Sequence, residues 1–113
     1  MNARLIIKTE ETETNLLFKD IEDKSFFAGD FDGEHYEVSL NDGILIKRNV
    51  NSQKTIFKIN KNTSSNVEII NENGSILLDI KVVEIIENNG MISLVYKIDN
   101  IKNSINLEFI REV

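Results

Sequence analysis

The 113-residue chain contains no cysteine, proline or tryptophan, and it has a single histidine. The absence of cysteine excludes disulfide bonds, thiolate nucleophiles and cysteine-based metal sites. The chain also lacks an apolar run of the roughly 18 residues that a membrane-spanning helix needs. No apolar signal segment follows Met1. We therefore expect a cytoplasmic protein without a membrane partner.

Positive charge is scarce as well. The chain has 13 Lys and Arg residues against 19 Asp and Glu residues, which gives a formal net charge of -6. A protein that binds DNA or RNA through phosphate contacts needs a basic face, so we expect no nucleic-acid partner. No linker or shift in composition divides the sequence, and we expect a single domain over residues 1–113.

Apolar and polar residues alternate with a period of two. The pattern is clearest in Glu34–Leu40, Met91–Asp99 and Ser104–Arg111. Such alternation is typical of strands with one buried face and one solvated face. Ile76–Glu87 is long enough for a helix, but its polar residues spread around a helical wheel. We predict instead a long strand that is bent by a β-bulge at Val82–Val83.

Turn residues separate the apolar runs about every 8–12 residues, as in antiparallel β-proteins. Asn73-Gly74 and Asn89-Gly90 predict tight type I′ hairpins, in which two consecutive residues adopt positive φ. Asp32-Gly33 and Asn41–Gly43 indicate turns of the same kind. Polar connections are expected at residues 49–53, 60–66 and 100–103.

About nine or ten strands follow from this spacing of turns. A short helix is expected at Lys19–Lys24, with Asp20 as its N-cap. Closing an antiparallel meander removes its exposed edges, which favours an up-and-down β-barrel. A two-sheet β-sandwich is the alternative.

Several turns and strands also follow the pattern of a known family. They are Gly43–Arg48, Thr55–Phe57, Asn62–Ser65, Asn73–Ile80 and, most clearly, Asn89–Ile98. Over about residues 34–110 the chain resembles the YwiB-like family of uncharacterised bacterial proteins. The resemblance implies an all-β, calycin-like (lipocalin-like) antiparallel barrel of about 8–10 strands. It implies no activity, because no function is established for the family.

The chain departs from the family pattern at two places. It is shorter between Gly29 and Gly43, which leaves open whether the barrel has a strand fewer or is partly open. It also has Asn49-Val50 after Arg48, where the family carries a small residue and a glycine.

Motifs for catalysis and metal binding are absent or incomplete. His35 falls on the polar face of its strand, so we interpret it as a surface residue. Asp30, Asp32 and Glu34 have the spacing of a calcium loop, but Asn41 stands where an EF-hand has its bidentate glutamate. We therefore interpret Asp30–Glu34 as a solvated β-turn. There is no Gly-x-Ser-x-Gly elbow and no glycine-rich phosphate loop. We therefore expect no enzyme, no catalytic residue, no metal and no cofactor.

Three residues that can orient a ligand fall on apolar strand faces. Arg48 is in phase with Ile44 and Ile46, and Tyr36 and Tyr96 are also on inward-facing positions. In a barrel lumen, a guanidinium and two phenols would orient a small amphipathic ligand among aliphatic walls. We predict a non-catalytic barrel that binds a small, partly apolar ligand through Arg48, Tyr36 and Tyr96. The alternative is an arginine with its head in water and two hydrogen-bonded core tyrosines.

A second functional hypothesis is a protein-interaction or homodimeric module with a filled barrel and no ligand. Leu45, Val95 and Ile110 are apolar residues on the polar phases of their strands. Apolar residues in such positions can form an interaction patch.

Overall fold

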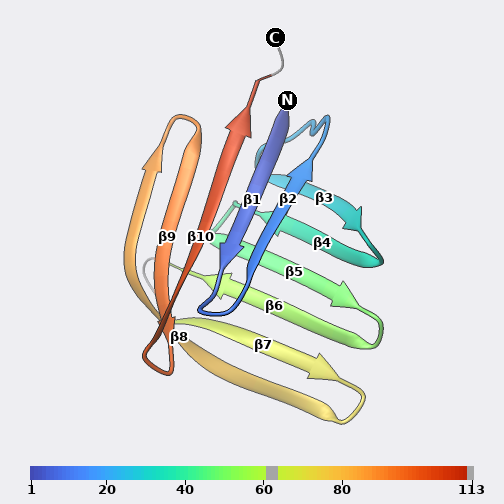
Figure 1. Cartoon of the computed structure of the whole chain (residues 1–113), viewed down its shortest axis with the longest axis vertical. Coiled ribbons are helices and arrows are strands. Elements are labelled where there is room, and N and C mark those ends of the chain that lie inside the picture. The colour runs from blue at the N-terminus through green and yellow to red at the C-terminus, as the bar shows by residue number, and fades with distance from the viewer. Residues whose placement is uncertain (61–63, 112–113) are drawn as a thin grey trace. The chain divides into compact units, whose positions relative to one another are not determined.

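The backbone of this computed structural model forms ten antiparallel strands, and the model describes residues 1–60 and 64–111 (Figure 1). The strands pair in the order β2-β1-β10-β9-β8-β7-β6-β5-β4-β3. Their bounds are Asn2–Lys8 (β1), Glu13–Phe18 (β2), Phe26–Phe31 (β3), Glu34–Ser39 (β4), Ile44–Val50 (β5), Gln53–Ile59 (β6), Ser65–Asn71 (β7), Gly74–Asn88 (β8), Met91–Ile98 (β9) and Ile101–Ile110 (β10).

Each strand from β2 to β10 except β3 pairs with the strand that precedes it in the sequence, and β10 returns to pair with β1. This confirms the predicted fold class as all-β, with ten antiparallel strands in an up-and-down order. The single ten-stranded order differs from the two sheets of the sandwich alternative. Within the described residues, no helix is long and apolar enough to cross a membrane.

The strands belong to two compact units. Unit 1 comprises Met1–Glu22 and Lys81–Val113, and unit 2 comprises Asp23–Ile80. The chain passes from unit 2 into unit 1 within the long strand β8. The register of β8 against β9 shifts between Val82 and Glu84, so the predicted bulge is confirmed.

Unit 1 buries the apolar face of β1, β2, β9 and β10. Leu5 lies directly opposite Leu16 on one side and Leu107 on the other, and Ile105 lies opposite Leu94. Leu5 is 1% exposed and Leu94 is 0% exposed. The alternation in the sequence therefore produces a dry face, because every second residue of each strand points to the same side.

Unit 2 repeats this arrangement on β3 to β8. Val38 lies opposite Phe27 and Ile46, and Ile46 lies opposite Phe57. Gly43 precedes β5 with a φ of 101°, and a Cβ added there would collide with the carbonyl oxygen of Ile59. A glycine is required at that position because only glycine offers both the conformation and the space.

Most predicted turns lie between strands, but the connections expected at residues 49–53 and 100–103 are shorter, because β6 begins at Gln53 and β10 begins at Ile101. Not all of the turns have the predicted conformation. Asp32 and Gly33 have φ values of 49° and 83°, as a type I′ turn requires. The type I′ prediction is wrong at Asn73-Gly74 and Asn89-Gly90, where Gly74 alone among these four has a positive φ. The amides of Asn73 and Gly90 instead donate to the side chains of Asn71 (2.8 Å) and Asn88 (3.4 Å). These local hydrogen bonds compete with the type I′ conformation.

Two other expectations concern loops. The helix predicted at Lys19–Lys24 is wrong, because Asp20 has a φ of 54° and the segment is held by β1. The amide of Ile21 donates to the carbonyl of Met1 (2.9 Å), and the amide of Asp20 donates to Asn2 Oδ1 (3.0 Å). The expected connection at residues 60–66 includes residues 61–63, which lie outside the described residues.

Candidate functional site

A row of five side chains crosses unit 2 on the face that buries Val38 and Ile46. Tyr36 (β4) lies directly opposite Arg48 (β5), and the row continues strand by strand to β8. Residues that are directly opposite in adjacent strands share a face and touch one another. We call this set the Arg48 row; its members are Tyr36, Arg48, Thr55, Ile69 and Ile76.

A carboxylate holds the polar end of the Arg48 row. Glu34 lies two residues before Tyr36 on β4, and its Oε1 forms an ion pair with Nη2 of Arg48. Its Oε2 accepts a hydrogen bond from the Tyr36 hydroxyl at 3.3 Å. The guanidinium carbon of Arg48 lies 6.0 Å from the centre of the Tyr36 ring, at the limit of a cation–π contact. Phe31 packs edge-on against the same ring, with 6.0 Å between ring centres.

These four residues, Glu34, Tyr36, Arg48 and Phe31, form what we call the Glu34 cluster. The hydrogen bond to Glu34 raises the pKa of Arg48, so the guanidinium is charged at every physiological pH. Burial raises the pKa of Tyr36, while the nearby Arg48 charge acts in the opposite direction. The side chains of Arg48 and Glu34 are 44% and 25% exposed, so the cluster lies at the boundary with water.

Tyr96 has a different environment in unit 1. It is 1% exposed on β9, and it lies opposite Asn103 and Val82. Burial raises the pKa of Tyr96 to about 12. Asn103 is also buried, and its Nδ2 donates to the carbonyl of Ile101 at 3.1 Å. Of the three residues predicted to bind a ligand, Tyr36 and Arg48 are thus in contact within unit 2, and Tyr96 belongs to the core of unit 1.

Glu34 is the residue of this site that the sequence interpretation missed. We assigned it to the solvated turn at Asp30–Glu34. Its alternation with Tyr36 and Val38 placed it on the apolar phase of β4, where a carboxylate needs a partner. That partner, Arg48, becomes evident only from the pairing register of β4 with β5.

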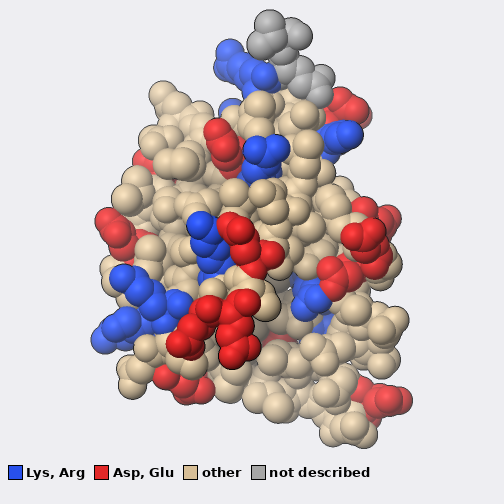
Figure 2. Space-filling view, viewed as in Figure 1, with Lys and Arg blue, Asp and Glu red and all other residues tan. Residues whose placement is uncertain are grey.

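His35 lies on the opposite face of β4. Its Nδ1 is 2.7 Å from Oδ1 of Asp30, and its Nε2 is 3.5 Å from Oε1 of Glu37. The hydrogen bond to Asp30 is the main cause of a raised pKa of His35. Among residues 1–60 and 64–111, no three His, Asp or Glu side chains are arranged to hold a metal ion. Figure 2 shows acidic and basic side chains interspersed over much of the visible face.

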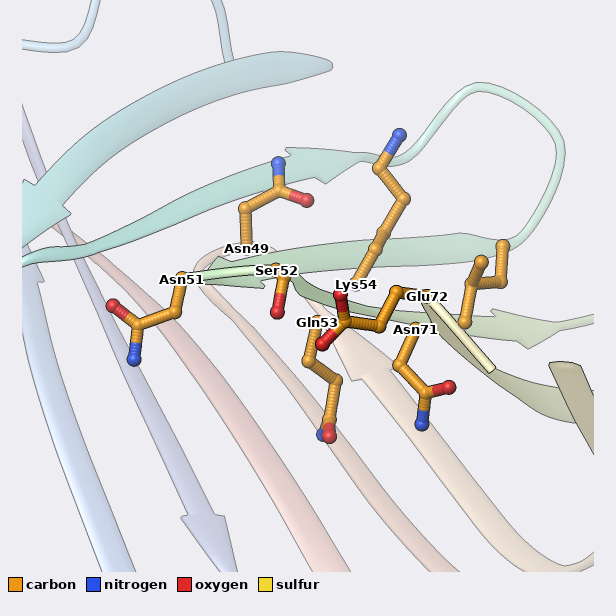
Figure 3. A pocket seen from close by; sticks show the side chains of 8 residues that line it. Asn49, Asn51, Ser52, Gln53, Lys54, Asn71 and Glu72 are labelled. Atoms are coloured by element: carbon orange, nitrogen blue, oxygen red, sulfur yellow. The ribbon is translucent and has the colours of Figure 1, made fainter. Parts of the chain in front are cut away.

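A hollow of about 450 Å³ lies between the tips of the β5–β6 and β7–β8 hairpins. In Figure 3, Asn49 and Lys54 point to one side of the ribbons, and Asn51, Gln53 and Asn71 point to the other. The hollow is open to solvent, and four of its eight lining residues carry amide side chains. Its lining residues are Asn49, Asn51, Ser52, Gln53, Lys54, Ile70, Asn71 and Glu72.

The residues proposed for an interaction patch are half-buried and are divided between the two units. Leu45 lies in unit 2, where it lines a hollow of about 140 Å³ together with Phe26 and Lys47. Val95 and Ile110 lie in unit 1. Each unit therefore carries its own separate part of that predicted patch.

Comparisons with family models and with curated proteins find no match to this chain. Among solved structures, the chain is similar to the crystal structure of the ywiB protein from Bacillus subtilis. The match has 13% sequence identity and a TM-score of 0.37, and it covers 97% of this chain and 89% of that chain. The chain is thus similar to a YwiB protein, and this similarity assigns no role to any residue.

Proposed function

We propose that this chain is a non-catalytic binding protein for a small amphipathic anion. In this proposal the Arg48 row holds the ligand on the core face of unit 2. The observation that carries it is the register, which puts a cation, a hydroxyl and two aliphatic side chains in one line across β5 to β8.

The exposure of the Arg48 row supports the proposal. Arg48 and Ile76 both lie on the face of the strands that is buried at Val38 and Ile46. The side chain of Arg48 is nevertheless 44% exposed, and Ile76 is 59% exposed. Burying a large aliphatic side chain contributes roughly 1.5–3 kcal/mol. A ligand with an apolar chain would gain part of this free energy by covering Ile76 and Ile69.

The charge of the ligand follows from Arg48. Its guanidinium carries five N–H groups in a planar fork, and Glu34 engages one terminal nitrogen. The remaining donors suit a carboxylate or phosphate head group, with the Thr55 hydroxyl as a neighbouring donor. From β5 to β8 the Arg48 row spans three interstrand spacings, about 14 Å. This length corresponds to a chain of medium length, with its head at Arg48 and its tail at Ile76.

The same groups support a binding role over catalysis. A nucleophile needs a base within hydrogen-bond reach, and a general base needs a pKa near neutrality. In the Glu34 cluster the pKa values of Tyr36 and Arg48 are both raised. These two groups can position a ligand, and both keep their protons at neutral pH.

Titration calorimetry with sodium dodecanoate tests the proposal. We expect the protein to bind dodecanoate and to reject dodecyltrimethylammonium, which has the same tail and the opposite charge. Arg48→Gln should weaken dodecanoate binding about tenfold or more, because it removes a charged hydrogen bond. Lys47→Gln is the matched control, since it removes the same charge from the other face of β5.

Equal affinities of Arg48→Gln and Lys47→Gln for dodecanoate would refute the proposal. So would the absence of any dodecanoate binding to the unaltered protein. Native mass spectrometry of the gently purified protein provides the companion measurement. A clean dimer without an adduct, dissociated by Leu45→Lys, would favour the interaction-module alternative.

A further inference from the structure

Four lysines from four adjacent strands lie together on the outer face of unit 1. Lys97 (β9) is directly opposite Lys81 (β8) on one side and Lys102 (β10) on the other. Lys8 (β1) is opposite Ser104, which is two residues from Lys102 and therefore on the same face. We call these four residues the lysine row.

Most of this charge is not neutralised by the protein. Lys8 forms an ion pair with Glu13 at 3.4 Å, in which both side chains are more than half exposed. In the part of the chain that the structure describes, Lys81, Lys97 and Lys102 have no carboxylate within 4.0 Å. Glu84 follows Lys81 in β8, and Asp99 lies in the turn after β9, but neither forms an ion pair with these lysines.

The arrangement is unfavourable for the isolated fold. Like charges that lie directly opposite one another on adjacent strands destabilise a sheet, and Lys97 has such a neighbour on both sides. The chain as a whole has a net charge of -6, so cations are concentrated here against the general composition. An anion bound along the lysine row would remove this repulsion.

A hollow of about 280 Å³ beside the lysine row indicates the size of that anion. It is lined by Lys8, Lys102, Thr9, Ser104, Asn103 and Val95. The ammonium and hydroxyl groups of this lining can donate hydrogen bonds to phosphate oxygens. Val95 is the one apolar side chain in this lining, whereas a protein partner needs an apolar centre to its interface.

We propose that the lysine row is a binding site for a small multivalent oxyanion of the oligophosphate class. The row from β8 to β10 spans two interstrand spacings, about 10 Å. A short linear chain of phosphoryl groups has a comparable length and can contact all three lysines at once. The hollow between Lys8 and Lys102 receives the terminal phosphoryl group.

Sodium tripolyphosphate is the probe that tests the site. We expect calorimetric binding that weakens steeply with salt, because several counterions are exchanged. Lys97→Gln should lower the affinity about tenfold, since it removes the central charged donor. Lys58→Gln, which removes an exposed lysine from unit 2, should leave the affinity unchanged. Equal losses in the two variants would overturn the proposal.

Thermal unfolding provides a second readout, which is taken first without the probe and then with it. Without an anion, Lys97→Gln should raise the midpoint of unfolding by roughly 1–5 °C, because it removes two like-charge contacts. Tripolyphosphate should raise the midpoint of the unaltered protein more than that of Lys97→Gln. A midpoint that Lys97→Gln lowers, or tighter binding of poly-glutamate than of tripolyphosphate, would contradict an oligophosphate site.

Discussion

The two units use the same strand alternation, yet the apolar phase ends differently in each. In unit 1 it leads to Leu94 and Tyr96, which are 0% and 1% exposed. In unit 2 the phase that buries Val38 continues into Arg48 and Glu34, whose side chains are 44% and 25% exposed. The apolar phase thus stays dry at these positions of unit 1, whereas in unit 2 it runs from a dry core at Val38 to a charged, half-solvated boundary at Arg48.

This difference shows that a tyrosine takes its environment from the residues opposite it. Tyr36 and Tyr96 are both at most 2% exposed. Tyr36 lies beside an ion pair, and its hydroxyl has a carboxylate acceptor at 3.3 Å. For Tyr96, burial is the cause of the raised pKa. We therefore expect the two units to differ in stability and in response to pH.

The largest expected effect is on the core of unit 1. Tyr96→Ala should lower the free energy of unfolding by about 3–5 kcal/mol, because it leaves a cavity in a packed face. Arg48→Ala should cost about 0.2–1 kcal/mol, since it removes a partly exposed ion pair. Urea denaturation of both variants measures the two costs. Equal costs would mean that the apolar phases of the two units do not differ as described.

Most of the fold could be predicted from the sequence, because strand alternation is a local property. The bulge at Val82 was predictable for the same reason, since the apolar phase slips there. The helix predicted at Lys19–Lys24 was wrong because the groups that hold this segment belong to Met1 and Asn2, which are distant in the sequence. The predicted type I′ conformation was also wrong at two turns, because a preceding asparagine side chain accepts a hydrogen bond from a backbone amide there.

The sites depend on register, which local patterns do not contain. Tyr36 and Arg48 were predictable as members of an apolar phase, but their contact requires the pairing of β4 with β5. Glu34 had the same phase and was assigned to a turn. The lysine row joins Lys81, Lys97 and Lys102 from three strands, and these residues become neighbours through two registers.

A second, smaller effect is expected at alkaline pH, and it sharpens the contrast between the tyrosines. The pKa of Tyr96 is about 12 in the folded protein, against 10.0 in a model compound. The unfolded chain therefore releases this proton first, so the stabilisation is complete below pH 10 and is lost as the pH rises toward 12. A shift of this size corresponds to about 3 kcal/mol at most.

Urea denaturation between pH 9 and about pH 11.5 measures that loss. Tyr96→Phe should flatten the decline of stability with pH, whatever its effect on stability at neutral pH. Absorbance of the phenolate provides a direct check, because it reports the pKa of each tyrosine in the folded protein. A decline equally steep in Tyr96→Phe would show that Tyr96 is not the residue that titrates.

The smallest expected effect concerns the outer face of unit 2. There, opposite charges lie next to one another, whereas the lysine row of unit 1 brings like charges together. The hydrogen bond to Asp30 raises the pKa of His35 above its ordinary value of 6.5, and Glu37 adds a weaker contribution. A raised folded pKa means that the stabilisation is complete below pH 6.5 and is lost as the pH rises through the folded pKa.

Imidazole NMR titration should show a larger fall in the His35 pKa for Asp30→Asn than for Glu37→Gln. If Glu37→Gln has the larger effect, the 2.7 Å contact with Asp30 is not what holds the proton. His35 would then belong with Glu37 and its cross-strand partner Lys47, and the outer face of unit 2 would be organised across strands, as the lysine row is in unit 1.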